Sequence, residues 1–327
     1  MRYAWLVAVL GALAIGGCSG GGDKKLQDAT GLAGLQQPMA IHLAPDGRVV
    51  VTEAGTGADD GRVSIVGADG QGRTVVLEGL PSVSGLGEPW GSVSGAAGAA
   101  VAPDGVACAA IGVPAPAPSP LGELRCSDGL KVDLLAWERE HNPDKLAVAS
   151  RPFDVAADGN EGWWVSDALA NTVLHVGRDG QVVLAGVFPS FGTFETPTEG
   201  MTTGLIVAGT SAVSAASVGP RGGIPERGGV VVALFNGALA VVRPVDPPDP
   251  GLGFAKTPKA IAVFATEEAL YYLLHTGDAP GLYDTSRKAI WTGSGGTGFV
   301  RLPDGSFLVS IGSEGRLVRV PAEGQGQ

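Results

Sequence analysis

The chain has 327 residues, of which 53 are glycine, and its formal net charge is −11. No basic patch is present, which excludes nucleic acid as an expected partner. The hydrophobic content of 44% excludes a disordered chain, because such a sequence can bury a core, so the glycines predict many tight turns. All-β chains of this length often form one domain, and we expect one domain and a monomer.

Residues 1–17 have the features of a lipoprotein signal peptide. Arg2 supplies positive charge, and the apolar run that begins at Leu6 has about ten residues, too few to span a membrane. The segment Ile15-Gly16-Gly17-Cys18 resembles a bacterial lipobox, whose cysteine carries the lipid. We expect palmitate on Cys18 and a flexible tether over residues 18–25. The alternative is an ordinary secretory signal with an incidental cysteine.

This signal peptide and lipidation site predict a location in the bacterial cell envelope, with the lipid anchor as the chain's contact with the bilayer. Ser19 rather than an aspartate follows the cysteine. In a Gram-negative host this favours the outer membrane or the periplasm. We therefore expect the partners to be envelope molecules.

A repeated sequence motif begins after the tether. It consists of an apolar run, an Asp-Gly turn and a second apolar run. The turn aspartates are Asp46, Asp104, Asp158 and Asp304. Asp-Gly between apolar runs indicates a hairpin, because the turn needs residues that tolerate positive φ. The first two intervals are nearly equal and the last is close to three times as long. Two degenerate copies are therefore expected in the long interval, over 201–216 and 258–274.

A period of about 40–50 residues with several strands per unit is typical of a β-propeller. Each unit also carries a second hairpin signal, so we predict an all-β fold with six antiparallel blades of four strands over residues 26–327. The last unit has only three predicted strands. A strand near Leu26–Leu32 is expected to complete it and to close the ring.

Two local predictions concern the connection between units two and three and the strand that follows it. A helix is expected from Asp133 to His141, with Asp133 as its N-cap. Trp163 and Trp164 are neighbours on one predicted strand, so they face opposite sides. Only one of the two rings is therefore expected in the core.

Apart from Cys18, the chain has two cysteines, Cys108 and Cys126. They lie in consecutive predicted strands, on either side of a Pro/Ala-rich loop. An exported protein can form disulfides, and we predict a bridge that clamps this loop. The alternative is a pair of buried thiols.

Several further segments form a recognisable set: Gly34-Leu35 through Pro38, Leu43 to Gly47, Val51 to Gly55, Leu134 to Asp144, and Val165 to Ala168. With these segments the chain resembles the ScyD/ScyE family of exported six-bladed propellers, within the broader NHL and SMP-30-like group. The resemblance covers most of the chain after the signal peptide. It implies an exported propeller but little about activity, and units four and five depart from the pattern because they lack the Asp-Gly turn.

Ligands of propellers usually lie at one mouth of the central channel, and three side chains that end second strands are candidates there: Glu53, Asp167 and His275. Carboxylate oxygens suit calcium, and SMP-30-type lactonases, which this plan resembles, combine Glu, Asn and Asp around one metal. Matching asparagines are missing, since Asn171 lies on the wrong side of its strand end and Asn142 lies between units. The alternative is that Glu53 and Asp167 bind neighbouring loops through hydrogen bonds.

Two other side chains keep two interpretations each. His275 could be a general base near neutral pH or a structural hydrogen-bonding group, and Trp90 could stack on a sugar or aromatic ligand or pack between blades. The motifs contain no complete catalytic set and predict no cofactor. The function we expect is non-catalytic binding of a protein, peptide or glycan. The alternative is a calcium-dependent, lactonase-like hydrolase with its site at the channel mouth.

Overall fold

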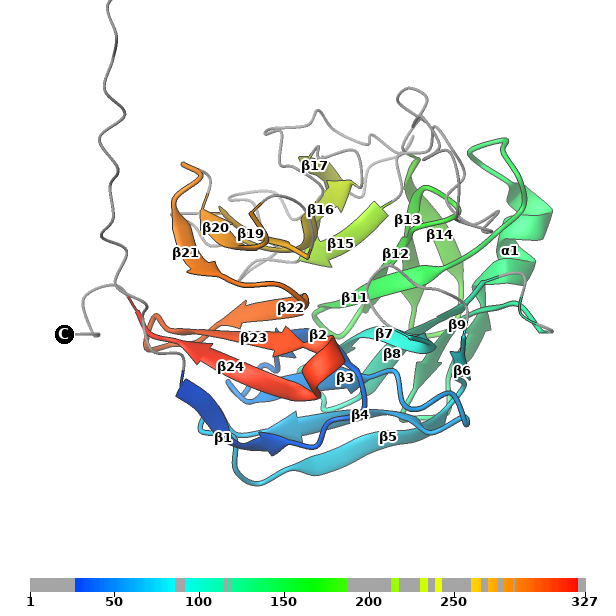
Figure 1. Cartoon of the computed structure of the whole chain (residues 1–327). Helices are drawn as coiled ribbons and strands as arrows, with labels where there is room; N and C mark the ends of the chain where they lie inside the picture. The colour runs from blue at the N-terminus through cyan, green and yellow to red at the C-terminus, as the bar shows by residue number, and fades with distance from the viewer. Residues whose placement is uncertain are drawn as a thin grey trace, which may run out of the picture.

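The computed structural model describes the residues 27–85, 92–114, 117, 119–187, 213–217, 230–234, 239–242, 260–265, 270–275, 279–284 and 286–322. They form an all-β propeller built from small antiparallel sheets (Figure 1). In this part of the chain, no helix is both long and apolar enough to cross a membrane.

Hydrogen bonding defines six sheets within the described residues. Three of them carry the first three Asp-Gly turns of the repeat. They are β2 (Pro38–Leu43), β3 (Val49–Glu53), β4 (Gly61–Val66) and β5 (Thr74–Leu80); β6 (Val83–Ser84), β7 (Val93–Val101), β8 (Ala107–Val113), β9 (Leu121–Cys126) and β10 (Lys131–Asp133); and β11 (Pro152–Asp158), β12 (Gly162–Asp167), β13 (Thr172–Gly177) and β14 (Val182–Val187).

The other three sheets follow. They are β15 (Val213–Ser217), β16 (Val230–Leu234) and β17 (Leu239–Val242); β18 (Ala260–Ala265), β19 (Leu270–Leu274), β20 (Gly281–Asp284) and β21 (Ala289–Thr292); and β22 (Gly296–Arg301), β23 (Phe307–Ile311) and β24 (Arg316–Val320) together with β1 (Gln27–Ala33).

The prediction of six four-stranded blades is wrong, because the described residues form five full blades in the ring and not six. Five of these sheets are full blades with four or five strands, whereas the described strands β15, β16 and β17 form a sheet of three. The unit that differs is one of the two that lack an Asp-Gly turn, and the copy expected over 201–212 lies outside the described residues. β1 is hydrogen-bonded to β24 in antiparallel register.

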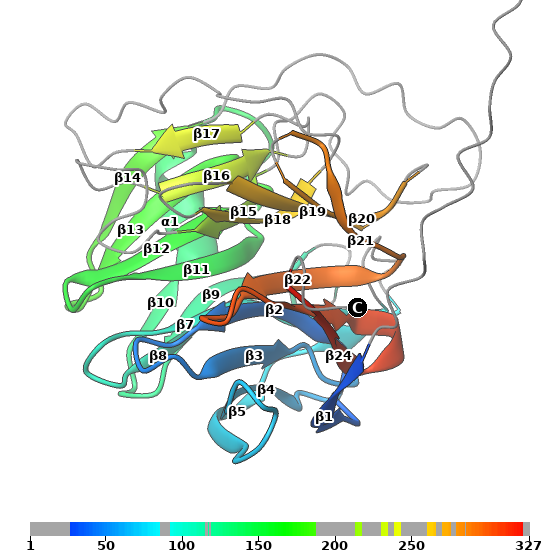
Figure 2. The ribbon, with the colours of Figure 1, turned by 90° about the vertical axis from the view of Figure 1, so that its left-hand side faces the viewer.

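One strand of each sheet lies innermost: β2, β7, β11, β15, β18 and β22. Figure 1 shows β2, β7, β11, β15 and β22 around the centre, while β5, β14 and β24 lie toward the rim. Successive innermost strands contact one another, and β22 contacts β2, so the first and last sheets lie side by side (Figure 2). Both faces of a blade are therefore covered by neighbouring blades.

This double coverage overturns one prediction. Trp163 and Trp164 point to opposite faces of β12, yet they are 0% and 3% exposed. Both faces of the strand are buried because blades stack on each side of it. Side chains that alternate along this strand therefore enter two different buried interfaces, and neither face of the strand points to solvent.

The predictions for the turns and the helix are confirmed. All four glycines of the Asp-Gly turns have positive φ: Gly47, Gly105 and Gly305 lie near +80° to +90°, and Gly159 has φ +53°. The helix α1 (Leu134–His141) begins after Asp133, whose carboxylate accepts the Ala136 N–H at 2.8 Å as an N-cap. A short 3-10 turn, Gly312–Glu314, precedes β24.

The predicted disulfide is also confirmed. Cys108 and Cys126 lie opposite each other on β8 and β9 and are bonded. Both side chains are buried. The bridge closes the segment that connects these two strands.

Candidate functional site

Glu53, at the end of β3, is a structural anchor. Its side chain is fully buried, and its carboxylate pairs with Arg62, at 2.9 Å from Nε to Oε1, and with Arg73. It also accepts the backbone N–H of Gln36 at 2.7 Å. All of these partners lie in or next to the same blade, so the carboxylate holds β3, β4 and the start of β5 together.

Asp167, at the end of β12, organises the chain around it. Its Oδ1 accepts the backbone N–H of Arg151 at 2.7 Å, of Ala170 at 3.1 Å and of Leu169 at 3.2 Å, and Oδ2 accepts the Ser150 hydroxyl. Burial raises the pKa of Asp167 above its ordinary value, although these hydrogen bonds oppose the shift. Its oxygens are therefore occupied by local donors.

His275 follows β19 and is bound locally as well. Its Nδ1 lies 2.7 Å from the Gly296 carbonyl oxygen, at the start of β22. Glu53, Asp167 and His275 thus each have separate partners, which favours their structural interpretations. The other predicted site residues, Trp90 and the lipidation residue Cys18, lie outside the described residues.

The turn aspartates Asp46 and Asp304 form hydrogen bonds within their own turns. The Asp46 and Asp304 carboxylates accept the backbone N–H two residues ahead, at 3.0 and 2.9 Å. These hydrogen bonds, with those of the neighbouring Arg48 and Ser306 side chains, hold the pKa of both carboxyls below the usual range. They stay ionised and stabilise the turns, as the sequence indicated.

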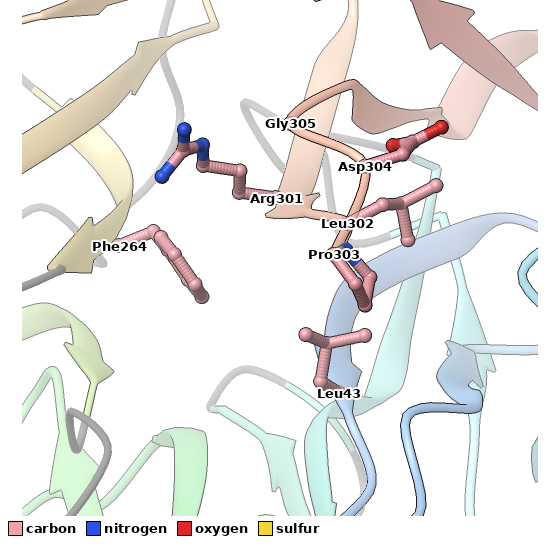
Figure 3. Close-up of a pocket in the computed structure, with 7 residues that line it drawn as sticks. All are labelled: Leu43, Phe264, Arg301, Leu302, Pro303, Asp304 and Gly305. Carbon is pink, nitrogen blue, oxygen red and sulfur yellow. The ribbon is translucent and has the colours of Figure 1, made fainter.

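An open cavity of about 400 Å³ lies at one end of the innermost strands, on the side away from Glu53 and Asp167. Pro38 and Pro152 begin β2 and β11 beside Glu53 and Asp167, whereas the cavity lies where β2, β18 and β22 end. Leu43, Phe264, Leu302 and Pro303 supply apolar surface, and Arg301, Asp304 and Gly305 complete the lining (Figure 3).

Arg301 is the cationic group of this cavity. Its guanidinium lies over the Tyr271 ring, 5.7 Å from the centroid, and it forms none of the ion pairs found among the described residues. Asp304 points away from it in Figure 3 and pairs with Arg319 at 2.5 Å. The positive charge of Arg301 is therefore available to a ligand.

A second feature missed at the sequence level is a partly buried pair on the innermost strands. His42 Nε2 on β2 lies 2.8 Å from Asp154 Oδ1 on β11, and the two side chains meet over Gly98 of β7, where a Cβ would collide with Asp154. Burial lowers the pKa of His42, but the charge and hydrogen bond of Asp154 outweigh it, so the pKa is raised overall. An oriented imidazole of this kind can move a proton.

Metal chemistry was expected only as a calcium alternative at the channel mouth. No group of three or more His, Cys, Asp or Glu side chains that could hold a metal ion occurs among the described residues. Glu53 and Asp167 are separately engaged, so they form no shared ligand set in this part of the chain.

Comparisons with known proteins identify the fold. No family model matches the chain, and no curated protein matches its sequence. A gluconolactonase from Xanthomonas campestris is similar in structure, with a TM-score of 0.52, 13% identity, and 90% of this chain and 89% of that chain covered. A streptogramin B lyase has a TM-score of 0.50 and 13% identity over 90% of this chain and 96% of that one.

These similarities show that the chain shares the propeller fold of these two proteins. At such low identity they carry no activity with them. The narrower resemblance to the ScyD/ScyE family stays a prediction.

Proposed function

We propose that the chain is an envelope binding protein whose cavity takes a ligand with an apolar body and one carboxylate. The ligand class is a small organic acid or the carboxyl end of a peptide. The observation that carries this proposal is Arg301, an ion without an anionic partner among the described residues, beside an apolar wall. A guanidinium fork matches a carboxylate with two parallel hydrogen bonds.

Calorimetric titration of the protein with an aromatic carboxylic acid, its neutral amide and a peptide with a free or amidated carboxyl end tests this proposal. The free acids should bind and the amides should not. Arg301→Gln should weaken binding by about tenfold or more, since a charged hydrogen bond contributes about 1.5–3 kcal/mol. Arg48→Gln is the matched control, because Arg48 is an exposed arginine in the equivalent turn of the first blade. Equal binding by the Arg301 variant would contradict the proposal.

A second candidate is hydrolysis of a lactone. The His42–Asp154 pair favours it, because a carboxylate-oriented imidazole can act as a general base. The structural neighbour from Xanthomonas campestris is described as a gluconolactonase. A lactone panel assayed with calcium and with EDTA tests this candidate: turnover that depends on calcium, and is lost in His42→Gln, would replace the binding proposal.

The predicted lipoprotein signal at the N-terminus belongs to the same proposal. We infer from the lipobox-like segment that Cys18 carries palmitate and that the propeller is anchored at the bacterial envelope as a monomer. Labelled palmitate should enter the native chain and not a Cys18→Ser variant. Label on the variant would point to an ordinary secretory signal.

A further inference from the structure

Glu138 is a buried carboxylate without a hydrogen-bond partner. It lies on the buried side of α1 with Leu134 and Leu135 and is 1% exposed. Both Oε1 and Oε2 are inaccessible to solvent, and no donor within the described residues reaches either of them. A carboxylate buried in this way is costly unless it is paired or binds a metal.

The groups around Glu138 are acceptors as well. Asn171 is fully buried, and its Nδ2 donates to Asp144 Oδ2 at 2.7 Å, while its Oδ1 has no partner among the described residues. Asn142, one helical turn after Glu138, donates through Nδ2 to the Leu146 carbonyl at 3.0 Å and also leaves its Oδ1 buried and unpaired. Four unpaired oxygens thus come from one corner of the fold.

The charges that act on Glu138 are both negative. Burial, and then the negative charges of Asp144 and Asp167, raise the pKa of Glu138 to about 8. The C-terminal end of α1, which Asn142 caps, adds the partial negative charge of the helix dipole. A cation would relieve the repulsion and supply the missing partner for each unpaired oxygen.

We propose that Glu138, Asn142, Asp144 and Asn171 form a calcium site where α1 meets the turn between β12 and β13. Calcium takes six to eight oxygen ligands, including carboxylates and the carbonyl oxygens of asparagine. The set contains two carboxylates and two amides, and nitrogen and sulfur ligands are absent from it, which disfavours zinc. Water and backbone carbonyls would complete the shell.

Such a site would have a structural role. The residues come from α1, the segment after it and the β12–β13 turn, and Asp167 beside them binds the backbone that leads into β11. The ion would therefore fasten the connection between the second and third blades to the third blade. It lies away from the Arg301 cavity, so its test is independent of the proposed function.

The probe is Tb³⁺, a calcium substitute whose luminescence a nearby tryptophan sensitises, and Trp137 precedes Glu138 on the helix. The native protein, stripped with EDTA, should show saturable Tb³⁺ emission that Ca²⁺ displaces. Ca²⁺ should also raise the melting temperature, because it binds the folded state. Glu138→Gln should weaken Tb³⁺ binding by about tenfold or more, since the charge count of the ligands sets the affinity. It should also reduce the rise in melting temperature that Ca²⁺ causes.

Glu140→Gln is the matched control: it makes the same change on the exposed side of the same helix and should leave Tb³⁺ binding unchanged. If Glu138→Gln does not fold, Asp144→Asn, at a half-buried position, replaces it and should weaken binding likewise. The absence of saturable binding by the native protein, or binding that neither ligand substitution weakens, would overturn the proposal.

Discussion

At the scale of single residues, Glu53 forms ion pairs with two arginines. The carboxylate is fully buried, whereas Arg62 and Arg73 keep 28% and 29% of their side chains exposed. Glu53→Gln keeps the shape of the side chain but leaves two cations against a neutral group. We expect it to lower the free energy of unfolding by about 3 kcal/mol, measured by urea denaturation.

The control is Glu78→Gln on β5, because Glu78 is exposed. It should change the free energy of unfolding by less than about 0.5 kcal/mol. A Glu53 variant as stable as the control would show that the buried ion pairs contribute nothing net. A stable variant that lost lactone turnover would instead revive the channel-mouth carboxylate as a functional group.

The His42–Asp154 pair makes a pH-dependent contribution to stability. The pKa of His42 is raised in the folded protein, so the folded state holds the proton more tightly than the unfolded state. The stabilisation is therefore complete below about pH 6.5, the unfolded value, and is lost as pH rises through the folded pKa. The native protein should lose its stability advantage over His42→Gln as the buffer changes from acid to alkaline.

Chemical denaturation at a series of pH values gives that difference directly. Asp154→Asn removes the charge that raises the pKa of His42. The stability of this variant should therefore depend less on pH than that of the native protein. An advantage over His42→Gln that stays constant, or grows, toward alkaline pH would contradict this assignment.

Residue roles could be predicted from the sequence where the cause is local. Asp46, Asp104 and Asp304 bind amides two residues away, and the Asp-Gly signal therefore sufficed. Glu53 was correctly placed at a strand end, but Arg73, one of its partners, is 20 residues away. His42 and Asp154 are 112 residues apart, and nothing in either segment marks the other, because the contact is created by how the innermost strands pack.

At the scale of elements, the β8–β9 hairpin is held by the disulfide. The bridge joins residues 18 positions apart, which in the chain-entropy account stabilises the fold by restricting the unfolded chain. Replacing both Cys108 and Cys126 with alanine should cost about 3 kcal/mol. The measurement is the urea midpoint and slope of the native and variant proteins.

Reduction of the native protein is the matching control, and it should lower the midpoint as far as the double substitution does. An unchanged midpoint in dithiothreitol would mean that the bridge adds nothing to stability. A larger loss in the alanine variant than in the reduced protein would assign the excess to packing of the two buried sulfurs.

Element boundaries followed from apolar runs and turn residues, and α1 followed from its cap. The error over Trp163 and Trp164 has a physical cause: alternation predicts which side chains share a face but does not say what covers that face. In stacked blades both faces are covered. The cavity at Arg301 was missed for a related reason, because its walls come from the ends of three strands that only the assembled ring brings together.

At the scale of the whole molecule, the first and last parts of the chain share one core. Leu32 on β1 is 1% exposed and belongs to a cluster with Ile41 and Val51 of the first blade and Val300 and Leu317 of the last. β1 also covers the edge of β24, which would otherwise present unpaired backbone groups. The N-terminal strand is therefore placed where it can join the two ends of the ring.

Leu32→Ala tests this joint without removing the strand. The cavity left in a buried cluster should cost about 2–4 kcal/mol, whereas Val75→Ala on the exposed side of β5, where Val75 is 43% exposed, should cost less than about 0.5 kcal/mol. If β1 joins the ends, the whole ring should still unfold in one transition, at a lower urea concentration. Native-like stability of the Leu32 variant, or a separate early transition confined to the last blade, would show that the ring is held closed without β1.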